Sequence, residues 1–572
     1  MSITTNVKEK ADLIWSIADK LTGVYKPHEY GRVILPLTVI RRFDCVLAET
    51  KSKVLEVQQE NYPDFFKITK LKEASGYDFY NVSPFTFEKI IAAPEDVTAN
   101  FKNYLNGFSK NVRNIIEKFN FDSEIERMDS KNILYRVLQE FTSDKANFHP
   151  DKISNLEMGY VFEEIIRRFS EAHNEDAGQH YTPREVIKLM VNLLFMNDKK
   201  IIDERDAIKT LYDPACGTGG MLSVAKETLA EINSTIDLRT FGQELNDETF
   251  AICQADTLIK GDEVENIKVG NTLSDDQFPE DNYDYILSNP PFGREWKNEK
   301  IAVTAEAAKG FSGRFGAGLP AVNDSQLLFL QTALAKMKPQ GTRIAIIHNG
   351  SPLFTGDAGS GTSEIRRYIL ENDFLEAIVA LPNEIFYNTG IATYIWLLTN
   401  KKSPERRGKV QLINANEIFT KMRKSLGMKR NEISDDQIKQ ITKFHTDFKE
   451  NEFSKIFDNA DFGYRKITVE RPLKDDDGNL ILKSGKRQPD TKLRDTENVP
   501  LKETVEEYFE REVLPFVPDA WIDNKKTVIG YEIPFTRYFY KYTAPPSTDE
   551  LATEIRALSQ DFNSNLDKIF AR

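Results

Sequence analysis

The stretch that decides the fold runs from Leu211 to Leu222 and reads Leu211-Tyr212-Asp213-Pro214-Ala215-Cys216-Gly217-Thr218-Gly219-Gly220-Met221-Leu222. This pattern predicts a strand that runs into a tight glycine turn and then opens a helix. Glycines remove side chains where a ligand must approach the backbone closely, and the start of a helix presents free N–H groups. The stretch therefore predicts a ligand-binding turn in an α/β fold.

The surrounding residues, from about 200 to 400, consist of short apolar runs that alternate with amphipathic segments. Such alternation implies parallel strands joined by helical crossovers, and hence a doubly wound α/β sheet. The last two predicted strands have no helix-length segment between them, which predicts an antiparallel pair closing one edge. The predicted strands are Lys209–Tyr212, Leu238–Gly242, Ile267–Val269, Tyr283–Leu287, Arg343–His348, Leu375–Ala380 and Ala392–Leu398, and the helices include Gly220–Ile232, Asp247–Lys260, Ser325–Met337 and Ser363–Glu371.

Two carboxylates near the glycine turn narrow the class of ligand. Glycine turns of this kind are common, but Asp213 at the strand end favours the methionine ammonium of S-adenosylmethionine. The same carboxylate would repel a pyrophosphate, which argues against a nicotinamide cofactor. The next predicted strand ends at Glu244, where α/β nucleotide-binding folds hold ribose hydroxyls. We interpret Glu244 as the ribose ligand, although without the glycine turn it would read as an ordinary surface residue.

The sharpest motif is Asn289-Pro290-Pro291-Phe292, which follows the apolar run Tyr283–Leu287. Two prolines fix φ and lack N–H groups, so backbone carbonyls are left pointing outward. The side-chain oxygen of Asn289 and the carbonyl of Pro290 can each accept one N–H of an amino group on a planar ring. They would hold the nitrogen lone pair toward an electrophilic methyl group, with Phe292 stacked on the ring. A plain turn is the alternative, but the position downstream of the glycine turn favours catalysis.

Together these motifs resemble the modification (M) subunit of type I restriction–modification systems, an N6-adenine DNA methyltransferase. The resemblance spans most of the chain. It implies a Rossmann-like S-adenosylmethionine-dependent methyltransferase domain with a helical N-terminal domain and a mostly helical C-terminal region. The cofactor contacts that it implies are Gln179, His180, Tyr181, Thr182, Pro183, Arg184, Asp213, Cys216, Gly217, Thr218, Gly219, Gly220, Glu244 and Asn271.

Two further segments bear on this resemblance. Leu381–Phe386 is similar to a late motif whose aromatic ring faces the target base, so Phe386 joins Phe292 as a stacking candidate. On the sequence alone Phe386 could equally belong to the core. Where the family usually has Gly-Asp-Thr-Leu, this chain has Asn271 in place of the acid. Because Asn271 can still hydrogen-bond an amino group, we expect cofactor binding to survive.

The resemblance also implies the substrate and the partners. The substrate is double-stranded DNA, from which the target adenine must be flipped before transfer. The partners are a separate specificity (S) subunit, a second M subunit and, in some assemblies, a restriction/translocase (R) subunit. Because this chain is acidic and has no evident repeated recognition module, we expect it to methylate DNA poorly by itself.

Length and patterning predict several domains. A chain of 572 residues exceeds what one core normally supports. We expect a helical N-terminal domain over residues 1–155, the methyltransferase domain over 156–405, and a mostly helical region for partner docking over 406–572. The last region contains an apparent hairpin of Lys466–Val469 with Leu480–Lys483 and a terminal helix capped by Ser547 and Glu550. Its apolar stripe either packs on its own domain or docks on a partner; the stripe is Leu551, Ile555, Leu558, Phe562, Leu566 and Ile569.

Composition excludes several classes of protein. The chain has 40% hydrophobic and 29% charged residues, which is typical of a soluble globular protein. It has no apolar run long enough to cross a bilayer and no recognisable secretion signal. Its cysteines, Cys45, Cys216 and Cys253, are far apart and its six histidines are scattered, so we expect neither a disulfide framework nor a metal site. A reducing cytoplasm is the expected location.

The net charge of the chain does not settle which surface would bind DNA. A net charge of −13 opposes DNA binding, so the basic surface must be local or supplied by a partner. Residues 401–430 contain ten Lys or Arg and two Glu, a net of +8. They could be a DNA-facing surface or a solvated linker and helix face, and the sequence favours neither. The Gly-rich segment Lys309–Asn323 is similarly either a lid or a passive loop.

Two rival functions compete with DNA methylation. Asn-Pro-Pro-aromatic motifs also serve methylation of glutamine amides in proteins, but the long chain, the upstream Tyr-Thr-Pro segment and the motif around Phe386 weigh against that substrate. A DNA-binding scaffold without turnover is the non-enzymatic rival. The intact Asp213, Glu244 and Asn289 argue against loss of activity.

Overall fold

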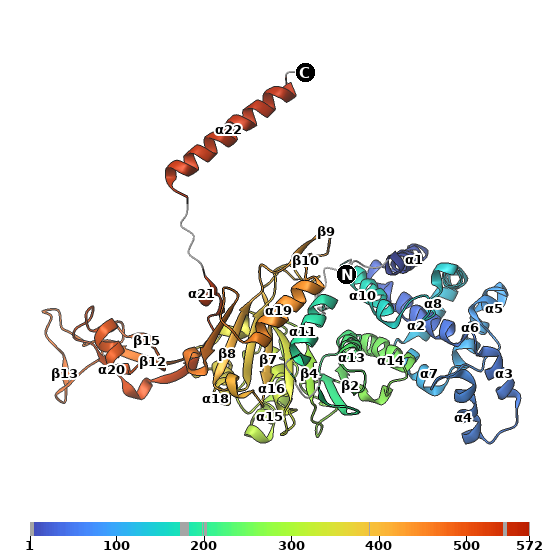
Figure 1. Cartoon of the computed structure of the whole chain (residues 1–572), viewed down its shortest axis with the longest axis horizontal. Coiled ribbons are helices and arrows are strands. Elements are labelled where there is room, and N and C mark those ends of the chain that lie inside the picture. The colour runs from blue at the N-terminus through green and yellow to red at the C-terminus, as the bar shows by residue number, and fades with distance from the viewer. Residues whose placement is uncertain are drawn as a thin grey trace. The chain divides into compact units, whose positions relative to one another are not determined.

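The computed structural model describes residues 5–171, 182–196, 198, 203–387, 389–540 and 546–570. Contacts divide the chain into two compact units, Met1–Ile533 and Pro534–Arg572. Figure 1 shows the N-terminal helices in blue to cyan, the strands of a large sheet in the middle of the sequence, and one long helix near the C-terminus. Within the described ranges, no helix is long and apolar enough to span a membrane.

The N-terminal part is helical, as the sequence predicts. Apolar residues at helical spacing bury one face of each helix in a shared core that includes Ile17, Phe43 and Phe101. Ala251 and Leu258, which belong to a helix of the α/β part, lie in the same core, so the two parts pack directly on each other. The N-terminal helices are α1 (Thr5–Leu21), α2 (Gly31–Leu47), α3 (Lys51–Gln59), α4 (Asp64–Ser75), α5 (Phe87–Ile91), α6 (Val97–Asn106), α7 (Lys110–Glu117), α8 (Phe121–Ser130), α9 (Leu134–Glu140) and α10 (Asn155–Glu171).

A nine-stranded mixed sheet forms the α/β part, in the order β11-β8-β6-β7-β5-β4-β1-β2-β3. All of its strands run in one direction except β7 and β11. The carboxyl ends of the others therefore lie at one edge. The strands are β1 (Ile208–Asp213), β2 (Asp237–Glu244), β3 (Ile267–Val269), β4 (Tyr285–Ser288), β5 (Arg343–Asn349), β6 (Leu375–Ala380), β7 (Thr393–Thr399), β8 (Lys409–Asn414) and β11 (Ser454–Asp458).

Helices cover both faces of this sheet, which confirms the predicted α/β fold. Successive residues of a strand point to opposite faces. In β5, Ala345 and Ile347 join the core beneath α11, α13 and α19, whereas the alternate residues Ile344 and Ile346 are buried on the other face. The helices are α11 (Arg184–Phe195), α13 (Gly220–Ile232), α14 (Asp247–Ile259), α16 (Gln326–Ala335), α18 (Gly361–Glu371) and α19 (Asp435–Asp447).

The prediction that the last two strands, Leu375–Ala380 and Ala392–Leu398, close one edge of the sheet is wrong. β6 and β7 are antiparallel as expected, but β7 lies between β5 and β6, and β8 and β11 extend the sheet beyond β6. Four of the six residues of β8, Val410–Ile413, are buried. This apolar run stands inside the basic stretch 401–430, where charge rather than strand pattern dominates the sequence.

The region after residue 405 combines helices, which account for more of its residues, with strands that the sequence did not predict. β12 (Gly463–Glu470) contains the predicted strand Lys466–Val469, but it pairs with β15 (Asp495–Pro500) and not with Leu480–Lys483. The proposed hairpin is therefore wrong. Pro472 follows β12 and cannot donate an N–H to a ladder, so the strand ends before the turn. Further elements are β16 (Trp521–Ile522), β17 (Val528–Tyr531), α20 (Val505–Tyr508) and α21 (Phe535–Phe539).

The terminal helix α22 (Thr548–Phe570) has the predicted cap. Ser547 Oγ accepts the N–H of Glu550 at 3.2 Å, and the Glu550 carboxylate accepts the N–H of Ser547 at 2.7 Å. Four residues of the expected apolar stripe, Leu551, Ile555, Leu558 and Phe562, have exposed side chains on this helix.

Candidate active site

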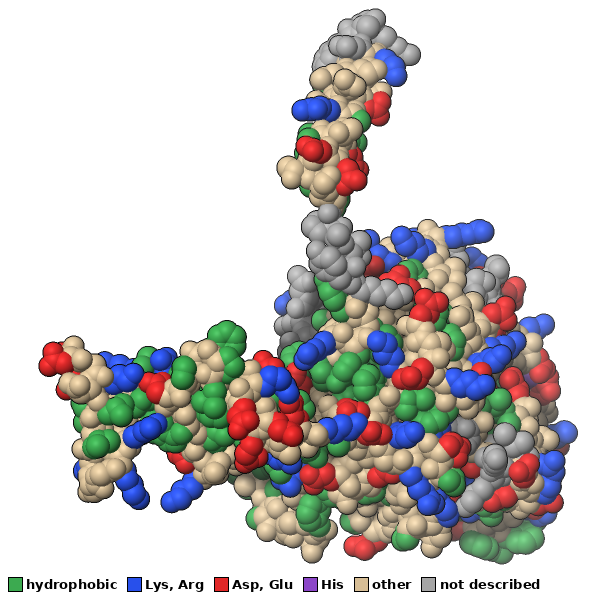
Figure 2. Space-filling model, turned by 60° about the vertical axis from the view of Figure 1, so that its left-hand side comes forward, with side chains coloured by type: hydrophobic (Ala, Val, Ile, Leu, Met, Phe, Trp, Pro, Cys, Tyr) green, Lys and Arg blue, Asp and Glu red, His purple; other side chains and the backbone are tan. Residues whose placement is uncertain are grey.

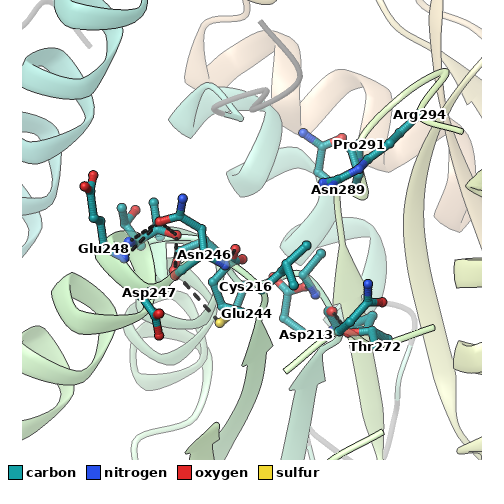
Figure 3. Close-up of a pocket in the computed structure, with 18 of the residues that line it drawn as sticks. Asp213, Cys216, Glu244, Asn246, Asp247, Glu248, Thr272, Asn289, Pro291 and Arg294 are labelled. Carbon is teal, nitrogen blue, oxygen red and sulfur yellow. Dashed lines mark hydrogen bonds between the residues drawn. The ribbon is translucent and has the colours of Figure 1, made fainter. Parts of the chain in front are cut away.

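A cavity of about 890 Å³ opens at the carboxyl edge of the sheet. Its lining includes Asp213 at the end of β1, Glu244 at the end of β2 and Asn289 directly after β4 (Figure 3). The volume is within the range of small-molecule and cofactor sites. Three polar residues from separate motifs of the sequence thus meet at one cavity.

Glycines shape the turn between β1 and α13. Gly217 and Gly219 have φ of +55° and +81°, values that L side chains rarely adopt. A Cβ on Gly219 would lie 2.7 Å from Sγ of Cys253. Gly219 is the N-cap residue of α13, so the helix begins at the cavity wall, which includes Thr218 and Gly220.

A buried ion pair supports this turn. Arg184, which the sequence assigned to the cofactor, pairs with Glu163 of α10 at 3.0 Å and donates to the carbonyl oxygen of Gly220 at 3.3 Å. Burial raises the pKa of Glu163 in spite of the guanidinium. Arg184 does not line the cavity, and Pro183 is the N-cap residue of α11. The structure therefore places Arg184 as a brace behind the glycine turn.

Asp213 is almost completely buried. Its Oδ1 accepts the N–H of Ala215 at 3.0 Å and the hydroxyl of Ser288 at 2.9 Å. Burial raises the pKa of Asp213 to about 7, although these two hydrogen bonds oppose the rise, and the nearby Glu244 contributes to it. A carboxylate held under these conditions would gain from a cationic partner.

Glu244 joins the two loops at the cavity. Its Oε2 accepts the N–H of Gly217 at 2.9 Å, and its Oε1 accepts the N–H of Asn246 at 2.8 Å. A carboxylate has about four lone-pair positions, so these bonds leave capacity to accept hydroxyl groups. Asn246 in turn caps α14 by accepting the N–H groups of Glu248 and Thr249 (Figure 3).

Cys216 and Asn271 complete the predicted cofactor contacts on the wall. A hydrogen bond with Cys253 and burial raise the pKa of the Cys216 thiol, which therefore stays neutral. The side chain of Asn271 donates to Glu299 at 2.7 Å and accepts the N–H of Leu273 at 3.0 Å. These contacts hold the Asn271 amide in one orientation.

The Asn-Pro-Pro-Phe segment stands opposite the glycine turn. Nδ2 of Asn289 donates to Oγ1 of Thr182 at 2.8 Å, which directs the amide oxygen away from Thr182. Pro291 lines the cavity and Pro290 is buried. The rings of Phe292 and Phe386 meet edge to face, with centroids 6.1 Å apart. The structure brings both stacking candidates together but in the buried core, with Phe292 8% and Phe386 1% exposed, and neither ring is part of the cavity lining. Gln179, His180 and Tyr181 lie outside the described residues.

The model of N-6 DNA methylases matches residues 154–470, which contain every wall of this cavity except its N-terminal residues. The chain belongs to the N-6 DNA methylase family. It is thus a DNA methyltransferase by family. A second model, that of the HsdM N-terminal domain, matches residues 11–141.

Relatives of the methylase align with it over most of both sequences. The type I restriction enzyme MjaIX methylase subunit of Methanocaldococcus jannaschii is 24% identical over 521 residues, covering 87% of this chain and 86% of the relative. The MpnII methylase subunit of Mycoplasma pneumoniae is 23% identical, covering 77% of this chain and 84% of the relative. The methylase is therefore similar to type I modification subunits along most of its sequence.

Solved structures show the same fold. The type I methyltransferase subunit from Streptococcus thermophilus superposes with a TM-score of 0.64 at 20% identity, covering 80% of the methylase and 97% of that chain. A modification subunit of a putative type I restriction enzyme from Vibrio vulnificus gives 0.52 at 17% identity, covering 88% and 98%. At this level of identity the likeness concerns the fold alone.

The methylase cavity also has walls that sequence reasoning missed. Arg32, Lys118 and Glu124 reach it from the N-terminal helices, and Asp247 and Glu248 from the start of α14. The N-terminal residues belong to a region without a recognisable motif, so no local signal pointed to them. Their presence shows that the helical part forms one side of the cavity.

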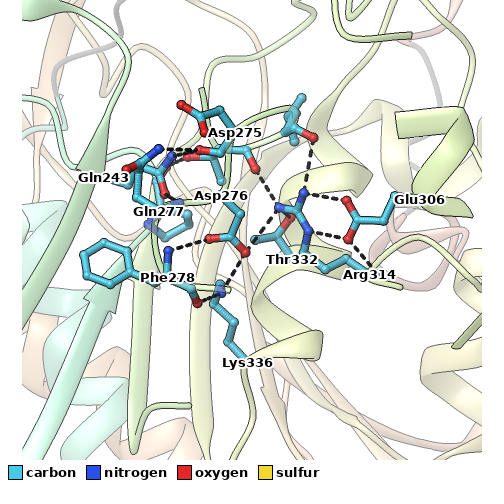
Figure 4. A network of polar contacts seen from close by, with 12 residues as sticks. Gln243, Asp275, Asp276, Gln277, Phe278, Glu306, Arg314, Thr332 and Lys336 are labelled. Carbon is cyan, nitrogen blue, oxygen red and sulfur yellow. Dashed lines mark hydrogen bonds and ion pairs between the residues drawn. The ribbon is translucent and has the colours of Figure 1, made fainter. Parts of the chain in front are cut away.

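A polar network fastens the Gly-rich segment 309–323, which the sequence left as either a lid or a passive loop (Figure 4). The guanidinium of Arg314 pairs with Glu306 at 2.7 Å and donates to the carbonyl oxygens of Thr272 and Leu273 at 2.6 and 3.2 Å. Lys336 pairs with Asp276 in the same network at 2.9 Å. In this structure the segment is tied to the residues that follow Asn271.

Proposed function

We propose that this methylase transfers the methyl group of S-adenosylmethionine to the N6 amino group of an adenine that is flipped out of duplex DNA. The observation that carries the proposal is the single cavity shared by Asp213, Glu244 and Asn289. Two carboxylates suit an ammonium group and ribose hydroxyls, and the amide suits an amino group. The donor set and the volume therefore fit this cofactor together with a base.

Residues on each side of the cavity have distinct tasks in this mechanism. Asp213 would hold the ammonium, Glu244 the ribose, and the glycine turn would let the ligand approach the backbone. S-adenosylmethionine supplies an electrophilic methyl carbon, and transfer leaves a thioether and one proton. Asn289 and the carbonyl of Pro290 would accept the two N–H groups of adenine and orient its lone pair. No strong general base is required.

Stacking and flipping complete the arrangement. The amino group of a paired base is inaccessible inside the duplex, so the nucleotide must leave the stack. Phe292, three residues after Asn289, would stack on the adenine ring, and Phe386, whose ring meets that of Phe292 edge to face, would support it. Adenine, with its planar ring and exocyclic amine, fits this combination of acceptors and aromatic rings.

We further propose that the chain is the cytoplasmic modification subunit of a type I complex, with an S subunit, a second M subunit and, in some assemblies, an R subunit. Residues 1–155 and 156–405 would form the helical and methyltransferase domains, and residues 406–572 the docking region. Support comes from the similarity to type I methylase subunits along most of the chain.

Incubation with tritium-labelled S-adenosylmethionine tests this function. We expect label in DNA, recovered as N6-methyladenine after digestion to nucleosides, when the chain is combined with the S subunit encoded beside it. The chain alone should transfer little. Label in protein glutamine, or in a base other than adenine, would contradict the substrate. Robust sequence-specific methylation by the chain alone would contradict the need for a partner.

The raised pKa of Asp213 predicts how cofactor affinity depends on pH. Only the ionised carboxylate attracts an ammonium, so affinity should rise as pH increases toward about 7, by up to tenfold per pH unit below that value. Calorimetric titration between pH 5 and 7.5 stays below the pKa of a free α-amino group, about 7.7–8.0. Asp213→Asn should bind more weakly and show a flat profile. A wild-type profile as flat as that of the variant would refute this role.

A further inference from the structure

A two-stranded hairpin, β9 (Thr420–Leu426) and β10 (Lys429–Glu432), carries much of the basic charge that the sequence left unexplained. Its residues from Thr420 to Arg430 include five Lys or Arg and no acid, in a chain of net charge −13. The cationic side chains that are exposed are Lys421, Arg423, Lys424 and Arg430. On the face drawn in Figure 2, by contrast, acidic and basic side chains are interspersed.

The charge along β9 is not neutralised by carboxylates among the described residues. Arg430 faces Glu384 at 3.5 Å. In the part of the chain that the structure describes, no carboxylate forms an ion pair with Lys421, Arg423 or Lys424. Three unneutralised cations on one exposed strand form an attractive site for a polyanion.

The turn of the hairpin and β10 are bonded to the segment that carries Phe386. The buried Lys429 ammonium donates to the carbonyl oxygen of Ile385 at 3.1 Å and pairs with Glu185 of α11. Asn431 donates from its side chain to the carbonyl oxygen of Asn383 at 2.8 Å, and the N–H of Met428 donates to Tyr387 at 2.7 Å. The hairpin and the Phe386 segment therefore form one structural unit.

Topology places this unit on the side of the molecule where the base must enter. The Phe386 segment follows β6, and the hairpin follows β8, both of which run parallel to β4. Their carboxyl ends therefore lie at the same edge of the sheet as Asn289. Phe386 in turn meets Phe292 at that edge. DNA that delivers a base to Asn289 would therefore approach the edge that also carries the hairpin.

We propose that the β9–β10 hairpin binds the phosphate backbone of duplex DNA next to the flipped nucleotide, with Lys421, Arg423 and Lys424 as the contacts. This inference rests on the proposed function and extends it to a surface of the chain. Contacts to phosphate carry no sequence information, but they fix the position of the duplex on the protein. They also offset locally the repulsion between DNA and an acidic chain. Reading of the target sequence would remain with a partner.

A second basic hairpin provides a matched control. β13 (Leu482–Lys483) and β14 (Lys486–Arg487) also expose three cations, Lys483, Lys486 and Arg487. The backbone hydrogen bonds beside this hairpin go to Leu473 and not to the Phe386 segment. Removing its charges changes the net charge by the same amount as removing those of β9.

The test measures how salt affects binding of the full-length chain to a fluorescein-labelled duplex of about 30 base pairs. In Lys421→Ala/Arg423→Ala/Lys424→Ala, the slope of log affinity against log salt concentration should fall by about 0.9 for each lost contact. Three contacts predict affinity about 500-fold weaker than for the wild type at 0.1 M salt, with the difference vanishing toward 1 M salt. Lys483→Ala/Lys486→Ala/Arg487→Ala should keep the wild-type slope. Both variants should bind S-adenosylmethionine normally, which shows that the cavity is intact.

Several results would overturn the proposal. They are an unchanged slope in the β9 variant, an equal loss in the β13–β14 control, and a wild-type chain whose DNA binding does not respond to salt. Normal DNA binding with failed assembly onto the S subunit would assign the hairpin to a protein partner instead. If the wild type shows the hairpin-dependent slope but transfers no methyl group to DNA with the S subunit present, the proposed function fails while this inference stands.

Discussion

Asn289→Ala is expected to lower the rate of methyl transfer by about 10²- to 10³-fold while leaving the affinity for S-adenosylmethionine near the wild-type value. The amide oxygen would accept an N–H that becomes more acidic as the nitrogen gains positive charge, so its contribution is larger in the transition state than in the ground state. Comparable polar groups that stabilise transition-state charge contribute about 2.7–4 kcal/mol. Single-turnover transfer to DNA by the complex with its S subunit measures the rate, and calorimetry measures the affinity.

A graded control comes from the residue that orients this amide. Thr182→Val keeps the shape of the side chain but removes the oxygen that accepts from Nδ2 of Asn289. The rate should fall by about 10- to 100-fold, less than in Asn289→Ala, because the amide can still reach its working orientation part of the time. Equal loss of cofactor affinity and transfer in Asn289→Ala would instead identify Asn289 as a structural residue.

Short-range patterns in the sequence were sufficient for the central elements of the fold. The bounds of β3, β6 and α13 agree with the predicted segments, because each is an apolar run or amphipathic stretch delimited by glycine, proline or a charge. The meeting of Asp213, Glu244 and Asn289 could also be predicted, since all three end parallel strands of one sheet. These inferences depend on a strand's own residues and on its direction.

Contacts between residues far apart in the sequence could not be predicted from local patterns. β12 pairs with β15 and not with the segment 480–483, which is nearer in the sequence. β8, which lies within a basic stretch, pairs with β6 in the large sheet. The hydrogen bond between Thr182 and Asn289 joins residues 107 positions apart. Arg184 braces the glycine turn by donating to Gly220 while it pairs with Glu163, a contact that no local pattern indicates. Each of these contacts is decided by packing between elements, which one sequence does not reveal.

The second large effect is expected from a substitution in the glycine turn between β1 and α13. Gly219→Ala should destabilise the chain by about 2–5 kcal/mol and weaken S-adenosylmethionine binding by at least tenfold. Alanine at φ +81° costs about 1–2 kcal/mol. In addition, its Cβ would lie 2.7 Å from Sγ of the buried Cys253, a contact that adds an overpacking cost of about 1–3 kcal/mol. Because Gly219 starts α13 at the cavity wall, relief of this contact must move the turn that faces the ligand.

Two further variants separate these causes. Gly261→Ala has a similar φ of +76° and open space around its Cβ, so it should show only the backbone cost and normal cofactor binding. Cys253→Ala in combination with Gly219→Ala removes the sulfur and should restore part of both the stability and the affinity. Denaturant unfolding and calorimetry on the four proteins give the two quantities. If the double variant is no better than Gly219→Ala alone, the close approach to Cys253 is not what requires glycine at this position, and backbone conformation alone explains it.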